Sequence, residues 1–195
     1  LEEDQLMVNL SHSHSAPPLN TSLSDQPGGV ELAEYTRGLA GRLTPAIEQA
    51  LSSLQPGYVI ARSGTCDLAT NRDFKTGPGD RPLVGYAPDT RVDHHLLALR
   101  LTDLSGRVLA VGVNYACHPT TLGFENNQFS PDYVGAYRET VESAHPGALA
   151  FFLQGASGEL APPYQYHGET DVADAYGRKL AYSTLAALAG APNRP

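Results

Sequence analysis

A pair of apolar segments, residues 96–101 and 108–115, constrains the fold more than any other feature of the sequence. Residues 96–101 are rich in leucine, residues 108–115 are rich in valine, and the short run 104–107 between them contains serine and glycine. Connections this short join antiparallel neighbours, so we predict a β-hairpin. A third apolar run, residues 148–153, is typical of a strand that is buried on both faces.

Helical patterns alternate with these strands. Apolar residues recur at helical spacing between positions 30 and 54, where Pro45 should kink or divide the helix because it cannot donate a backbone hydrogen bond. Residues 133–143 and 171–189 are also predicted to be helical. The remaining predictions are strands over 6–10 and 58–61 and loops over 16–28 and 71–88. The fold class that follows is α/β, a layered mixed sheet with flanking helices.

Composition excludes several classes of partner. The hydrophobic fraction of 41% and the charged fraction of 17% are typical of a globular chain rather than a disordered one. The formal charge of −8, from 13 basic and 21 acidic residues, argues against a nucleic-acid surface. No apolar run approaches the roughly 18 residues of a transmembrane helix, so no transmembrane segment is predicted.

The two cysteines, Cys66 and Cys117, are too few for the disulfide framework of a small secreted domain. One bridge between them stays open as an alternative, but we predict two reduced, buried thiols. Alternation along an extended chain directs Cys117 away from the neighbouring His118, which makes it a small buried hydrophobe rather than a metal ligand.

The first candidate site is the serine–histidine run at residues 11–15, directly after the predicted strand 6–10. Side chains two residues apart lie on the same face of an extended segment, so His12 and His14 can reach one site. Imidazole is a common zinc ligand and also serves as a general base. The alternative is a pair of surface histidines in a polar loop.

A second candidate is His118, which follows the predicted strand 108–115 and precedes Pro119. Proline restricts the residue before it to extended backbone, which preorganises a ligand. The alternative is a satisfied core histidine. A third segment, residues 154–162, is small and polar; Ser157 lacks the spacing of a hydrolase nucleophile elbow, which favours a structural turn. Arg72 alone is a weak signal.

Taken in chain order, these segments resemble the N-terminal catalytic domain of the neutral/alkaline non-lysosomal ceramidase family. The resemblance implies a zinc cofactor, with His12 and His118 as zinc ligands, and catalytic or substrate-contacting roles for His14 and Arg72. It also implies that a glutamate and a tyrosine ligand lie beyond residue 195. The matching segments are 11–17, 71–72, 92–93, 114–120, 130–133 and 152–162.

The resemblance further implies that residues 1–195 are a single, partial catalytic domain, an internal piece that is inactive in isolation. The absence of an initiator methionine at Leu1 agrees with that expectation. Many members of the family are bacterial or secreted, so export to the periplasm or the medium is an expectation too. Oligomeric state is not predicted.

The function that the resemblance implies is hydrolysis of an acyl amide, N-acylsphingosine or a related small-molecule or lipid substrate, by metal-activated water. Ceramidases place a serine where this chain has Ala161. Two alternatives therefore stand beside ceramide hydrolysis. One is a zinc hydrolase of another amide or an ester, and the other is a catalytically degenerate relative that binds a lipid or glycan.

Overall fold

The computed structural model describes residues 5–23 and 25–194. The chain divides into two compact units: a larger one formed by Leu1–Ser15 with Gly57–Pro195, and a smaller one formed by Ala16–Pro56. No helix in the described part of the chain has the length and apolar character needed to cross a bilayer.

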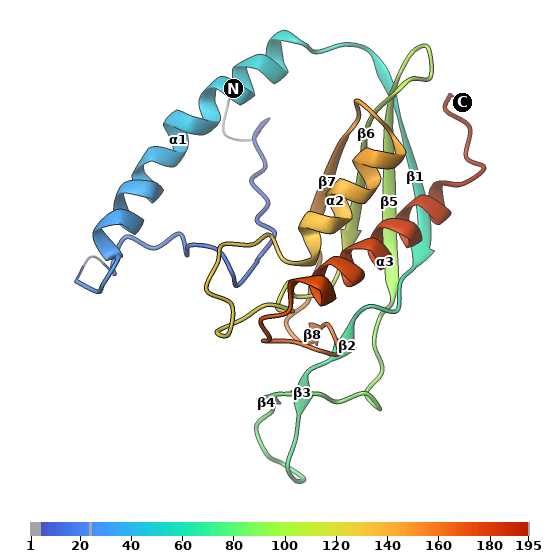
Figure 1. Ribbon diagram of the computed structural model, residues 1–195. Helices are drawn as coiled ribbons and strands as arrows, with labels where there is room; N and C mark the ends of the chain where they lie inside the picture. Colours follow the sequence, from blue (N-terminus) through green and yellow to red (C-terminus); the bar gives the residue numbers. More distant parts are fainter. Residues whose placement is uncertain (1–4, 24, 195) are drawn as a thin grey trace. The chain divides into compact units, whose positions relative to one another are not determined.

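The centre of the larger unit is a four-stranded sheet in the order β1-β5-β6-β7 (Figure 1). β1 pairs with β5 and β5 with β6 in antiparallel register, whereas β6 and β7 are parallel. The predicted mixed sheet and the predicted hairpin are therefore confirmed. The strands are β1 (Gly57–Thr65), β5 (His95–Asp103), β6 (Val108–Tyr115) and β7 (Leu149–Gln154).

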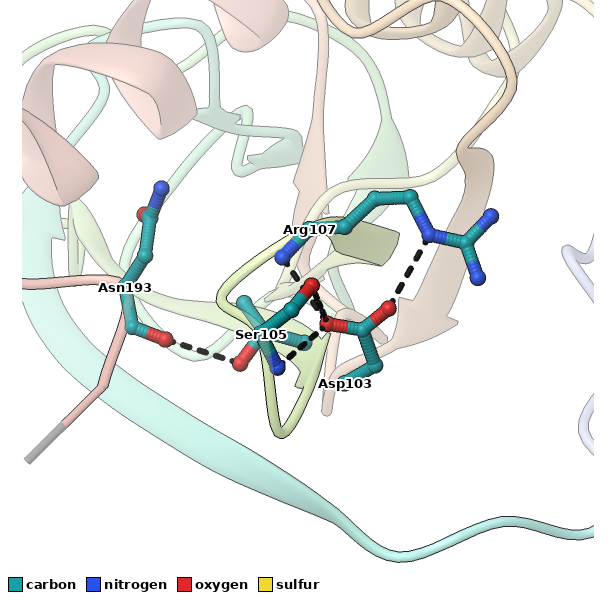
Figure 2. Close-up of polar contacts among 5 residues, drawn as sticks. Asp103, Ser105, Arg107 and Asn193 are labelled. Carbon is teal, nitrogen blue, oxygen red and sulfur yellow. Dashed lines mark hydrogen bonds and ion pairs between the residues drawn. The ribbon is translucent and has the colours of Figure 1, made fainter.

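The turn between β5 and β6 is organised by the carboxylate of Asp103 (Figure 2). It accepts hydrogen bonds from the backbone N–H and the hydroxyl of Ser105, at 2.9 and 2.6 Å. It also accepts from the backbone N–H and Nε of Arg107, both at 3.0 Å. The Ser105 hydroxyl and the Arg107 guanidinium lower the pKa of Asp103 far below its ordinary value, because they favour the ionised carboxylate.

Two helices, α2 (Tyr133–Ala144) and α3 (Thr170–Leu188), pack against each other and cover one face of the sheet (Figure 1). Close approach is possible because Gly177 of α3 has no side chain: a Cβ there would lie 2.3 Å from the carbonyl oxygen of Tyr133. Both helices were predicted. The largest fully buried side chains of these helices and of the sheet include Tyr133, Tyr137, Leu180, Leu96, Val111, Val113 and Tyr115.

The smaller unit contains one long helix, α1 (Gly29–Ser52), preceded by the predicted loop. Pro45 lies inside this helix, so of the two predicted effects, a kink or a division, the division is wrong. A proline removes one backbone hydrogen bond. The bonds on either side keep the helix continuous, and the hydroxyl of Thr44 donates to the carbonyl of Ala40 at 2.8 Å.

Two strand predictions differ from the structure. Residues 6–10 form no strand, and Leu6, Met7, Val8 and Leu10 are exposed. Their contact with the sheet is made by a side chain, since Asn9 Oδ1 accepts from the backbone N–H of Gln154 at 3.2 Å rather than through a backbone ladder. The strand β7 is not buried on both faces: Ala150 and Phe152 are buried on one face, whereas Leu149 on the other face is 67% exposed.

The predicted loop over 71–88 carries short strands. β2 (Thr70–Asn71) pairs antiparallel with β8 (Leu160–Ala161), and β3 (Asp73–Phe74) pairs with β4 (Leu83–Val84). The β2–β8 pair is the important one for the site. It brings the residues that follow β2 alongside the segment that follows β7.

Candidate metal centre

The candidate site lies where β6 and β7 end. These strands are parallel, and their last residues, Tyr115 and Gln154, are register partners. Carboxyl ends of neighbouring parallel strands meet at one edge of a sheet, which is where α/β folds build their sites. His118 follows β6 at this edge, and the loop 155–159 follows β7. Two segments far apart in the chain thus meet here.

His118 is held by the loop that follows β7. Its backbone N–H donates to the carbonyl oxygen of Leu160 at 2.8 Å. Its ring Nδ1 lies 2.5 Å from the carbonyl oxygen of Ser157 and 3.1 Å from that of Leu160. Carbonyl oxygens only accept hydrogen bonds, so Nδ1 carries the proton and Nε2 keeps its lone pair. This is the arrangement in which a histidine ligates a metal through Nε2.

The electrostatic surroundings keep His118 neutral. Burial lowers the pKa of His118, and the positive charge of Arg72 lowers it further, while the two carbonyl contacts act in the opposite direction. The net change is downward. A neutral imidazole at neutral pH is the form that binds a metal ion.

His12 and His14 come from the exposed loop at residues 11–15. This loop is fastened on two sides: the backbone N–H of His14 donates to the carbonyl of Pro119 at 3.3 Å, and the hydroxyl of Ser13 donates to the carbonyl of Ser130 at 2.9 Å. His12 has a φ of 64°, in the left-handed region that few non-glycine residues adopt. The loop therefore directs both imidazoles toward His118.

The three imidazoles converge. One ring nitrogen from each of His12, His14 and His118 lies within 4.8 Å of the others. The ring centroids of His12 and His118 are 4.7 Å apart, those of His12 and His14 are 5.2 Å apart, and those of His14 and His118 are 5.7 Å apart. Burial, and then the charges of His12 and Arg72, lower the pKa of His14. Clustered imidazole nitrogens can hold a transition metal such as zinc.

Arg72 completes the group. Its backbone N–H donates to the carbonyl of Glu159 at 2.8 Å, and its Nε donates to the carbonyl of Gly158 at 3.0 Å. One terminal nitrogen, Nη2, lies 3.1 Å from Nε2 of His118. The structure thus brings together all four residues singled out from the sequence, although they are contributed by three separate segments.

Several contributors to the site were not predicted. The backbone carbonyls of Ser157 and Gly158 hold His118 and Arg72, and no side-chain pattern could indicate that role. The hydroxyl of Ser157 accepts a hydrogen bond from Gln154 Nε2 at 2.7 Å, which agrees with a structural turn rather than a nucleophile. Tyr166 was also missed; its hydroxyl lies 3.3 Å from Nη1 of Arg72.

Two further positions bear on the chemistry. Ala161 is fully buried in β8, where its carbonyl accepts from the hydroxyl of Thr70 at 3.0 Å, and its methyl group supplies no nucleophile. Cys66 and Cys117 are both free and buried, as predicted. Burial raises the pKa of the Cys117 thiol well above its ordinary value, which disfavours the thiolate needed to bind a metal.

No protein-family model matches the chain. Among solved structures, the chain is similar to neutral ceramidase from Pseudomonas aeruginosa, with a TM-score of 0.64, 21% identity, and coverage of 80% of this chain and 26% of that one. It is also similar to a ceramidase complexed with C2, with a TM-score of 0.72, 22% identity, and coverage of 93% and 30%. The chain therefore has the fold of part of these proteins, spanning less than a third of either, and this fold agrees with the resemblance drawn from the sequence.

Proposed function

We propose that this chain supplies part of the active site of a zinc-dependent hydrolase of amide bonds, similar to the ceramidases. The observation that carries the proposal is the convergence of the nitrogens of His12, His14 and His118 beside a fixed arginine. The similarity in fold to two ceramidases supports it.

The residues present fit a zinc ion. His12 and His118 are the proposed ligands, and His118 offers Nε2 because its Nδ1 proton is engaged by two backbone carbonyls. Such outer contacts orient the ring and raise the basicity of the ligating nitrogen. When bound, zinc supplies Lewis-acid chemistry: it polarises a carbonyl and makes water a nucleophile at neutral pH.

His14 is proposed to move a proton. Its lowered pKa leaves a ring nitrogen unprotonated at neutral pH, able to accept a proton from the attacking water. The same nitrogen, once protonated, can return the proton to the departing amine. The backbone hydrogen bond from His14 to Pro119 fixes this histidine in place, and its ring nitrogen lies within 4.8 Å of those of the other two imidazoles. His14 is therefore held beside the proposed reacting atoms.

Arg72 is proposed to bind the substrate's carbonyl oxygen. Its guanidinium is held by the carbonyl of Gly158, and Nη2 lies 3.1 Å from Nε2 of His118. A zinc ion on Nε2 would take the lone pair that Nη2 faces, which would leave Nη2 as a donor for the substrate oxygen. A preorganised donor stabilises the negative charge that develops on that oxygen as the amide is attacked.

The proposed substrate is an acyl amide, N-acylsphingosine or a related lipid. Attack by water requires no serine, so Ala161 alters the choice of substrate more than the class of reaction. Because the buried Ala161 has no hydroxyl, an ester or a different amide is the second candidate.

The test is hydrolysis by the full-length protein that contains this chain. It is assayed with N-acylsphingosine, a short acyl amide and the matched ester, before and after chelation. We expect amide cleavage that chelation removes and added zinc restores. Faster cleavage of the ester by the same criterion would support the second candidate. Cleavage that is indifferent to chelation would overturn the proposal.

A further inference from the structure

Tyr166 has an unusual backbone conformation for an aromatic residue. Its φ is 64°, and His12 and Asp132 are the other non-glycine residues in the described part of the chain with positive φ. A bulky side chain in this region is a conformational outlier that persists only when the surroundings hold it. Such outliers gather at functional sites, and His12 is already part of the histidine cluster.

The backbone of Tyr166 is held by the segment that follows His118. Its N–H donates to the carbonyl of Thr120 at 2.8 Å, and the N–H of the next residue donates to the carbonyl of Thr121 at 2.9 Å. The two segments approach so closely that a Cβ on Gly123 would lie 2.8 Å from the Cα of Tyr166. The position of the phenol is therefore tied to the position of His118.

The phenol contacts Arg72. Nη1 of Arg72 donates to the hydroxyl oxygen of Tyr166 at 3.3 Å, while Nε donates to Gly158 and Nη2 faces His118. A guanidinium is planar and rigid, so contacts on three of its nitrogens leave it a single orientation. The contact with Tyr166 fixes Nη1, at the end of the guanidinium plane opposite to Nε.

We propose that Tyr166 is a positioning residue whose hydroxyl oxygen holds the Arg72 guanidinium with Nη2 directed at the histidine cluster. The assignment deepens the proposed function and rests on it for its catalytic consequence. The structural claim, that Tyr166 positions the Arg72 guanidinium, rests only on the contacts of these two residues and does not depend on the proposed function.

The chain offers a matched pair of variants. Tyr166→Phe removes the hydroxyl and keeps the ring, which stacks on Phe124 with the centroids 6.5 Å apart. Tyr164→Phe makes the same change two residues earlier, where the ring stacks on His167 instead. A general disturbance of this segment would affect both variants, whereas loss of the Arg72 contact affects only the first.

The first experiment needs no catalysis. The ¹⁵N–¹H resonance of the Arg72 Nε–H group is identified in the full chain by its disappearance in Arg72→Ala. We expect Tyr166→Phe to shift or broaden this resonance, with Tyr164→Phe leaving it in place. An Arg72 resonance that is unchanged in Tyr166→Phe would overturn the assignment.

The second experiment measures amide hydrolysis by the full-length protein. Loss of one oriented hydrogen bond should lower kcat about tenfold in Tyr166→Phe, with little change in KM. Arg72→Ala combined with Tyr166→Phe should be no slower than Arg72→Ala alone, since the two residues act as one unit. Additive losses would overturn the assignment. If the parent protein hydrolyses no amide, the proposed function fails, and the resonance of Arg72 still decides the role of Tyr166.

Discussion

The Nδ1 atom of His118 lies 2.5 Å from the carbonyl oxygen of Ser157, and this contact sets which ring nitrogen is available to a ligand. The proton stays on Nδ1, and Nε2, which lies 3.1 Å from Nη2 of Arg72, is the nitrogen that is left for a ligand. A backbone carbonyl thus determines the chemistry of a side chain that is 39 residues away in sequence. The geometry of the loop after β7 is therefore as important to the site as the histidines themselves.

Packing of the two helices that cover the sheet gives the first prediction. Gly177→Ala should lower the free energy of unfolding by about 1–3 kcal/mol, because the new Cβ would overlap the carbonyl oxygen of Tyr133 and force α2 and α3 apart. Urea-induced unfolding followed by circular dichroism measures the change. Gly41→Ala is the control: nothing lies within 4 Å of a Cβ there. In the interior of α1 it should stabilise by up to about 1 kcal/mol. Two changes of the same sign would contradict this account.

The buried hydroxyl of Tyr115 gives the second prediction. It donates to the carbonyl of Cys66 at 2.7 Å and accepts from the N–H of Ala69 at 2.9 Å, which fastens the turn before β2 to the end of β6. Tyr115→Phe leaves both backbone groups without a partner and should lower the free energy of unfolding by about 1–3 kcal/mol. Tyr182→Phe, at an exposed ring, should change it by less than about 0.5 kcal/mol. Equal effects in the two variants would argue against the role of the buried hydroxyl.

The turn at Asp103 gives a pH-dependent prediction. Its pKa is lower in the folded chain than the ordinary value of 3.8, so the folded chain binds fewer protons at this position than the unfolded one. The stabilisation is then complete above pH 3.8 and is lost as the pH falls toward the lower, folded pKa. Asp103→Asn should be less stable than the parent near neutral pH, and the gap should narrow in acid.

Urea midpoints for parent and variant at about pH 7 and about pH 3 measure this gap. Asp80→Asn serves as the control, since the Asp80 carboxylate accepts from the hydroxyl of Thr76 and pairs with no cation among the described residues. Near neutral pH, Asp80→Asn should lower the free energy of unfolding by less than Asp103→Asn does. A gap for Asp103→Asn that stays constant across the two conditions would show that the charge of Asp103 is not the stabilising feature.

Most of the layered fold could be predicted from local patterns. The hairpin formed by β5 and β6 follows from two apolar runs and a short turn, and both covering helices follow from periodicity. Residues 6–10 were misjudged because an apolar run predicts a strand only where a neighbouring edge pairs with it. Here Asn9 makes the contact through its side chain. The edge position of β7 depends on the order of the strands, which no local pattern contains.

The site, too, contains some residues that the sequence can predict and others that it cannot. His12, His14 and His118 carry their chemistry in their residue type, so the sequence can nominate them. Tyr166 lies 94 positions from Arg72, and its role depends on a left-handed backbone and on a hydrogen bond that exist only in the folded chain. The backbone carbonyls of the loop after β7 hold His118 and Arg72, and this role also cannot be predicted from residue type.

Elemental analysis of the purified full-length protein and of three single variants tests whether His12 and His118 hold a zinc ion. His12→Ala and His118→Ala each remove a proposed ligand, and His95→Ala removes an exposed histidine outside the cluster. We predict about one zinc ion per chain in the parent and in His95→Ala, and loss of that zinc in the other two. Zinc retained equally in all four proteins would contradict the assignment of His12 and His118 as its ligands.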